Sequence, residues 1–130
     1  MPRKPFVVLV GVVVAISLAF ATTGFGQSGS ATMSATKLKG TVGPNFTISL
    51  TKGGKKVKTL KPGAYTFVIS DKASIHNFTL EQEKGGHFEK HLTTTPFTGT
   101  KTVTVTLKKG SWKYYCSVHE SSMHGEFTVK

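Results

Sequence analysis

The segment TKTVTVTL, residues 100–107, alternates strictly between two kinds of side chain. Val103, Val105 and Leu107 fall on one face of an extended chain, and threonines fall on the other. Because successive side chains of a β-strand point to opposite sides, this alternation is typical of a strand that buries one face. The segment therefore predicts a half-buried strand.

The same period recurs on both sides of this segment. Turn signals such as Gly43-Pro44, Gly53-Gly54 and Pro62-Gly63 separate the runs. We expect eight short strands, near residues 37–42, 46–51, 56–60, 64–70, 76–81, 101–107, 111–116 and 125–130. The longest gap, residues 82–99, is expected to be a loop with room for a helical turn. Many short, half-buried strands predict an all-β fold, a β-sandwich with Greek-key connections.

The first part of the chain is expected to lie outside this domain. Arg3 and Lys4 precede an apolar run at residues 6–20, and Ala19-Phe20-Ala21 offers small residues around a cleavable bond. This order predicts a secretory signal over residues 1–21, with an uncleaved membrane anchor as the alternative. Residues 22–36 are rich in Gly, Ser and Thr and predict a flexible linker, which leaves residues 37–130 as the folded domain. The protein is then exported, periplasmic or extracellular, and membrane-tethered if the signal stays.

The net charge of the chain indicates which classes of partner it can bind. The formal net charge is +11, and loss of Arg3 and Lys4 lowers it to +9. Such a balance favours acidic protein partners or anionic surfaces. Nucleic acid is not an expected partner, because an exported protein is separated from the nucleic acids of the cell. The sequence also shows no basic helix that could bind them. The lysine-rich stretch at residues 51–61 is expected to be a solvated edge hairpin, since charged edges discourage strand-to-strand aggregation.

Near its end the chain reads YYCSVHESSMHGEF, residues 114–127, and this stretch contains the only cysteine. Cys116 is followed by His119, Met123 and His124. A lone cysteine cannot form an internal disulfide. A thiol, two imidazoles and a thioether within nine residues instead suggest a metal site.

The strand period adds a residue from elsewhere in the sequence. His76 shares a face with Phe78 and Leu80, and Cys116 shares a face with Trp112 on its own expected strand. If the two strands run antiparallel, the start of one meets the end of the other. His76 and Cys116 are therefore expected to converge at one end of the sandwich.

Two histidines, a cysteine and a methionine have a specific coordination chemistry. A trigonal His₂Cys set with a weak axial methionine is the ligand arrangement of an electron-transfer copper site. Soft sulfur favours Cu(I), while imidazole serves both oxidation states. Zinc is the rival metal, because Cys/His/His is also a zinc set, but a thioether in the fourth place suits copper better.

The motifs HNFTL and YYCSVHESSMHG resemble those of the cupredoxins, the small blue copper proteins. The resemblance implies one copper ion held by His76, Cys116, His119 and, more weakly, Met123. It also implies that Asn77 ties the ligand loops together and hydrogen-bonds near the thiolate. In the family, the histidine that matches His119 reaches the surface through an apolar patch and is the exit for the electron.

The function expected from this resemblance is that of an exported, monomeric one-electron carrier between redox proteins, with no enzymatic activity. The alternative is a copper-binding protein that stores the ion or delivers it to an oxidase. Copper enzymes add further copper centres through extra histidine clusters such as H-x-H pairs, and the sequence has none.

A few residues stay outside this interpretation. His124 directly follows the methionine and either lies outside the site or competes for the axial position. His87 and His91 would form a second metal pair if the long loop were helical, and are otherwise solvated. Asn45 and Asn77 begin Asn-Phe-Thr triplets that match a glycosylation sequon, but the pattern is short.

Overall fold

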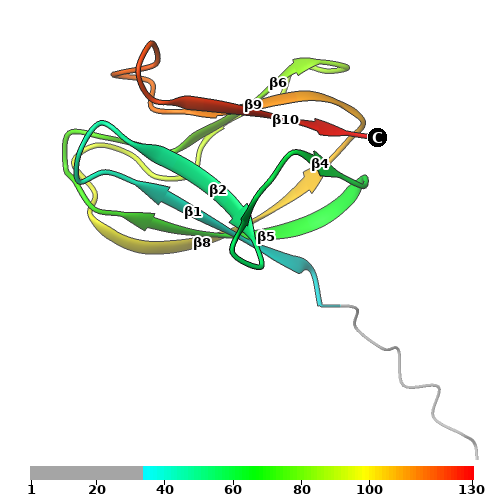
Figure 1. Ribbon diagram of the computed structural model, residues 1–130, viewed down its shortest axis with the longest axis horizontal. Coiled ribbons are helices and arrows are strands. Elements are labelled where there is room, and N and C mark those ends of the chain that lie inside the picture. The colour runs from blue at the N-terminus through cyan, green and yellow to red at the C-terminus, as the bar shows by residue number, and fades with distance from the viewer. Residues whose placement is uncertain (1–33) are drawn as a thin grey trace, which may run out of the picture. The chain divides into compact units, whose positions relative to one another are not determined.

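Two five-stranded sheets make up the part of the chain that the computed structural model describes, residues 34–130 (Figure 1). These residues lie in one compact unit, Thr32–Lys130. The predicted signal and residues 22–33 of the predicted linker lie outside the described residues. Within residues 34–130, no helix is long or apolar enough to span a membrane.

The first sheet has the strand order β3-β2-β1-β5-β8. Its strands are β1 (Thr36–Val42), β2 (Ile48–Lys52), β3 (Lys55–Lys56), β5 (Gly63–Asp71) and β8 (Gly99–Leu107). Strand β1 pairs parallel with β5, and the other pairs are antiparallel.

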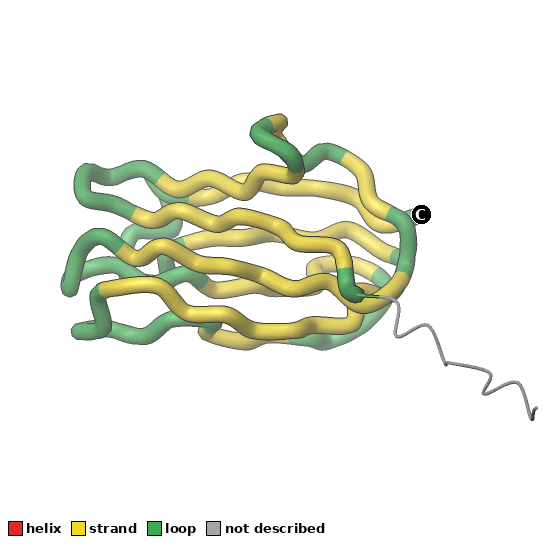
Figure 2. Tube along the Cα trace, turned by 90° about the horizontal axis from the view of Figure 1, so that it is seen from below, coloured by secondary structure: helices red, strands yellow, loops and turns green. Residues whose placement is uncertain are grey.

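The second sheet has the strand order β4-β10-β9-β6-β7. Its strands are β4 (Thr59–Leu60), β6 (Thr79–Lys84), β7 (Glu89–His91), β9 (Gly110–Tyr115) and β10 (His124–Val129). The chain crosses between the sheets at several connections, among them β5 to β6, β7 to β8 and β8 to β9. Figure 2 shows the strands running along the long direction of the domain, with most connections at its two ends. The all-β sandwich expected from the alternation is confirmed.

The core lies between the inner faces of the two sheets. Val105 and Leu107 are buried on β8, as the alternation of residues 100–107 predicts. Stacked aromatic rings line the side of the second sheet, where Tyr114 of β9 lies 5.7 Å from Phe78, the residue before β6, with the two rings nearly parallel. Burial of side chains of this size stabilises a fold by about 1.5–3 kcal/mol each, so this layer is a rigid base for the loops above it.

Residues 34–130 contain ten strands rather than eight, and two local predictions are wrong. The segment predicted as one strand at 56–60 is divided between β3 and β4, which belong to different sheets. Val57, between them, is buried in the core, so the chain crosses from sheet to sheet at this point. The gap at 82–99 contains the strand β7 and no helical turn. The lysine-rich hairpin does form an edge, because β3 is an outer strand of its sheet.

Four loops gather at one end of the sandwich, which is called the loop end below. They are residues 43–47, 72–78, 92–98 and 116–123. In Figure 1 they lie at the left, while the C-terminus lies at the right. The opposite end, where β5 begins and β8 and β10 finish, is called the far end.

Candidate metal centre

The antiparallel pairing of β6 with β9 builds the site. Thr79, the first residue of β6, pairs with Tyr115, the last residue of β9. His76 precedes the first by three residues, and Cys116 directly follows the second. The predicted convergence is confirmed, although His76 lies in a loop rather than on the strand.

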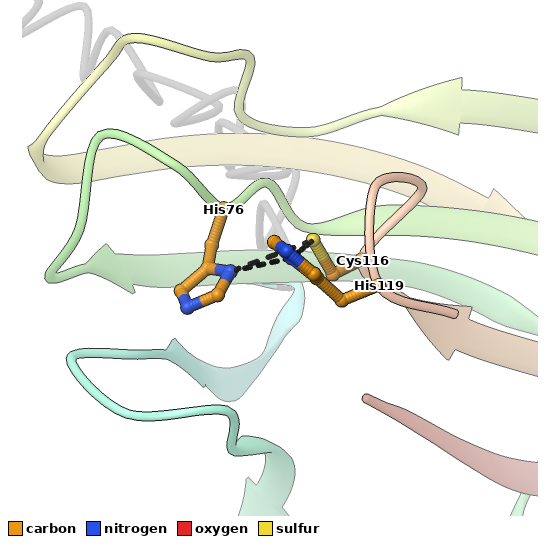
Figure 3. A group of neighbouring side chains, drawn as sticks. All are labelled: His76, Cys116 and His119. Atoms are coloured by element: carbon orange, nitrogen blue, oxygen red, sulfur yellow. Dashed lines mark hydrogen bonds between the residues drawn. The ribbon is translucent and has the colours of Figure 1, made fainter. Parts of the chain in front are cut away.

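Three ligand atoms meet at the loop end of the sandwich (Figure 3). The Nδ1 atoms of His76 and His119 are 3.1 Å apart, and the Cys116 Sγ is 3.8 Å from each. His76 and Cys116 are fully buried, and His119 is partly exposed. Within residues 34–130, this is the one group of three or more His, Cys, Asp or Glu side chains close enough to hold a metal ion.

The spacing of these atoms fits a metal ion. The point equidistant from all three in their plane lies about 2.1 Å from each, against about 2.0–2.1 Å for zinc–imidazole and ~2.3 Å for zinc–thiolate bonds. Two imidazoles and one thiolate at the corners of a triangle are the trigonal set of electron-transfer copper sites. The spacing therefore fits one small metal ion, and the number and kind of the donor atoms suit copper.

Met123 closes the loop that carries two of these ligands. Its carbonyl accepts a hydrogen bond from the Cys116 N–H at 3.0 Å, and its N–H donates to the His119 carbonyl at 2.9 Å. Its side chain is fully buried and packs in the core cluster. Together with His76, these residues form a type 1 copper-like site.

His124 has a different environment from Met123. It is exposed on β10, and its Nδ1 contacts the Glu120 carbonyl at 2.8 Å. The alternation along β10 buries Gly125 and leaves His124 on the outer face. The side chain next in sequence to the methionine therefore faces away from the core.

Asn77 joins the two ligand loops. Its backbone N–H points to the Cys116 Sγ at 3.5 Å. Its Oδ1 accepts from the Ser117 N–H at 3.0 Å, and its Nδ2 donates to the Ser117 Oγ at 2.7 Å. These contacts agree with the role that the sequence resemblance implies. Side chains that orient ligands in this way set the affinity and potential of a metal site.

Replacing Asn77 by alanine should destabilise the metal-free domain by about 2 kcal/mol, since a buried network loses its central partner. That corresponds to a fall in Tm of roughly 10 °C for a domain of this size. Asn45→Ala is the matched control, because Asn45 is exposed, and it should change stability by less than about 0.5 kcal/mol. Thermal unfolding measures both. Equal effects of the two changes would show that Asn77 does not hold the loops.

A further chain of hydrogen bonds leads from Asn77 to the surface. The Thr79 hydroxyl donates to the Asn77 Oδ1 at 3.0 Å and contacts the Nδ1 of exposed His91 at 2.6 Å. Because the threonine hydroxyl has one hydrogen, which goes to Asn77, the His91 Nδ1 donates to Thr79. His91 therefore supports the site's network from strand β7, and the helix that would have paired it with His87 is not formed.

Phe46 covers the two histidine rings. Its ring meets that of His119 edge to face at 4.9 Å and that of His76 at 5.3 Å. Phe46, Ile75 and Val118 are each more than half exposed, and they are the exposed large hydrophobic residues of the described chain. All three belong to loops at the loop end, and they are called the apolar rim below.

Charged groups hold the loop of residues 116–123 against the outer face of the second sheet. Lys113 forms ion pairs with Glu81, Glu83 and Glu120, the last at 2.7 Å. The hydrogen bond to Glu120 raises the pKa of Lys113 further than burial lowers it. Burial raises the pKa of Tyr115, whose hydroxyl also donates to the Glu89 carboxylate at 2.7 Å. Since Glu120 lies between His119 and Met123, its ion pair holds this loop against β9.

The sandwich with a type 1 copper-like site at its loop end was compared with known proteins. No family model and no curated protein matches the sequence. Among solved structures, auracyanin A, a blue copper protein from Chloroflexus aurantiacus, is similar over 75% of this chain and 100% of its own, at 17% identity and a TM-score of 0.51.

Two other solved structures are similar at lower TM-scores. Rusticyanin from Thiobacillus ferrooxidans has 23% identity, covers 75% of this chain and 79% of its own, and has a TM-score of 0.45. Reduced Cu(I) amicyanin has 16% identity, covers 74% and 82%, and has a TM-score of 0.46. At these identities the likeness concerns the fold alone. The chain has the cupredoxin fold, with a type 1 copper-like site at its loop end.

Proposed function

We propose that this protein is an exported type 1 copper protein that carries single electrons between redox partners. The observation that supports it most is the triangle of His76, Cys116 and His119, with distances that fit one ion and with only His119 partly exposed. Bound copper would supply a one-electron couple between Cu(I) and Cu(II). His76, Cys116 and His119 would hold it, and Met123 would be a weaker fourth ligand.

The protein's own contribution is rigidity. His76 is fixed by a tight loop, in which the Asp71 carboxylate accepts from the Ala73 N–H and the His76 N–H donates to the Ala73 carbonyl. Cys116 and His119 are fixed by the loop bonds to Met123. Ligands held in this way rearrange little when the charge at the site changes, which favours fast electron transfer. Burial beneath Phe46 also keeps water away from the site.

We further propose that electrons leave at His119 through the apolar rim. His119 is the partly exposed member of the triangle, and the rim surrounds it with apolar surface. The four loops at this end contain only two charged residues, Lys72 and Glu120. An acidic docking face on the partner stays a prediction, and the local charge favours an apolar contact instead.

Val118→Asp should slow electron self-exchange between oxidised and reduced copies by about tenfold, because a charge then has to be buried when two rims meet. Thr128→Asp, an exposed change of the same charge at the far end, should alter the rate less than about twofold. NMR line broadening in mixtures of the two oxidation states measures the rate. Equal slowing by both changes would place the exit elsewhere.

Copper storage or delivery is the competing function. It would favour exposed clusters of methionine and histidine, but within residues 34–130 His87, His91 and His124 belong to no group of three or more His, Cys, Asp or Glu side chains that could hold a metal ion. A carrier should lose copper slowly to a strong chelator in both oxidation states, since its ligands are buried. Copper loss within seconds from the reduced protein would favour delivery.

A further inference from the structure

The lysines of the domain are distributed unevenly along its long direction. Strand pairing places the segments 57–62, 84–88, 108–109 and residue 130 at the far end, away from the copper-like site. These segments contain six lysines, all exposed: Lys58, Lys61, Lys84, Lys108, Lys109 and Lys130. A groove at this end is also lined by Lys52 together with Lys61 and Lys130.

Acidic residues are fewer than lysines on this surface. The far-end segments contain none, and Glu83 and Glu126 on the adjoining strands β6 and β10 line a pocket with Lys58. The glutamates of ion pairs in the described chain are Glu81, Glu83 and Glu120, and all three are bound to Lys113. The domain is therefore an electrical dipole, with a lysine-rich far end and a nearly uncharged loop end around His119.

The described part of the chain begins at the same end. Strand β1 begins at Thr36, which pairs with Tyr65 near the start of β5. Strand β1 therefore runs from the lysine-rich far end toward the loop end.

We infer that the far end binds the surface of a bilayer that contains anionic phospholipids, with the copper-like site facing away. Lysines near such a surface are attracted to the headgroups over about a Debye length, ~8 Å at physiological salt. The apolar rim at the opposite end then stays free for redox partners. This inference goes beyond the proposed electron transfer and does not depend on which metal the site holds.

The test uses the domain of residues 32–130, a compact unit that contains the whole core. It should sediment with vesicles of phosphatidylcholine plus phosphatidylglycerol and not with phosphatidylcholine alone. Replacing Lys61, Lys108 and Lys109 by glutamine should weaken this binding about tenfold or more at low salt. Only the backbone carbonyls of these lysines hydrogen-bond within the domain, so the fold should not change.

The matched control makes the same change of net charge elsewhere. Lys39→Gln, Lys72→Gln and Lys101→Gln together should weaken vesicle binding no more than about twofold, because these exposed lysines lie off the far end. Val118→Asp at the loop end should leave binding unchanged. Equal losses from both triple variants, or no preference for phosphatidylglycerol, would overturn the inference and leave an acidic protein as the partner of this surface.

Discussion

Replacing Cys116 by serine is expected to remove the visible colour of the Cu(II)-loaded protein completely. The colour of such a site comes from charge transfer between thiolate sulfur and copper, and Cys116 is the only thiol in the chain. Copper affinity should also fall by more than about 100-fold, since loss of residues that merely orient ligands already costs 10–100-fold. Absorption spectroscopy and a copper titration measure the two effects.

Ser121→Ala is the control for this experiment. Ser121 lies in the same loop, between His119 and Met123, and is exposed. Its replacement should leave both the colour and the affinity unchanged. A serine variant at position 116 that keeps an intense visible band would show that the thiolate of Cys116 is not a ligand.

Replacing Met123 by glutamine should lower the reduction potential while copper stays bound. A thioether favours Cu(I), whereas an amide oxygen is a harder donor that favours Cu(II). We expect a shift of at least about 60 mV, which corresponds to a tenfold change in the relative stability of the two oxidation states. Voltammetry of the loaded protein measures it.

His124→Ala is the matched comparison at the next position. His124 is exposed and bonded to the Glu120 carbonyl, so its loss should move the potential much less. If the His124 change produced the larger shift, the axial ligand would be His124. The hydrogen bonds of Met123 would then position the loop only.

The sandwich could be predicted from sequence because most strands bury one face. Val105 and Leu107 alternate with threonine. This two-residue alternation can be recognised without knowing which strands lie beside β8. The prediction failed where a strand is too short to show a period. Strand β7 has three exposed residues and depends on pairing with β6, which no local pattern records.

The ligand residues were accessible to sequence reasoning for a similar reason. The antiparallel neighbours β6 and β9 bring His76 and Cys116 together even though His76 lies before the strand. Phe46 was not identified as a neighbour of the site. It was expected in a strand, and its contact with the ligand rings depends on the shape of the loop at 43–47.

The sequence gives the total charge of the protein but not where the charged side chains lie on its surface. Composition gives a large positive total, which predicts attraction to something acidic. Only the structure shows that six of the lysines lie at the far end and that Lys113 is paired with three glutamates. A net charge therefore predicts the sign of a partner but not the face that meets it.

The most direct test of the proposed carrier is a spectroelectrochemical cycle on the wild-type protein loaded with one equivalent of copper. We expect an intense band toward the red end of the visible spectrum, which disappears on uptake of one electron and returns in full on reoxidation over repeated cycles. A colourless Cu(II) complex, or a band that does not return because copper is lost on reduction, would contradict the account.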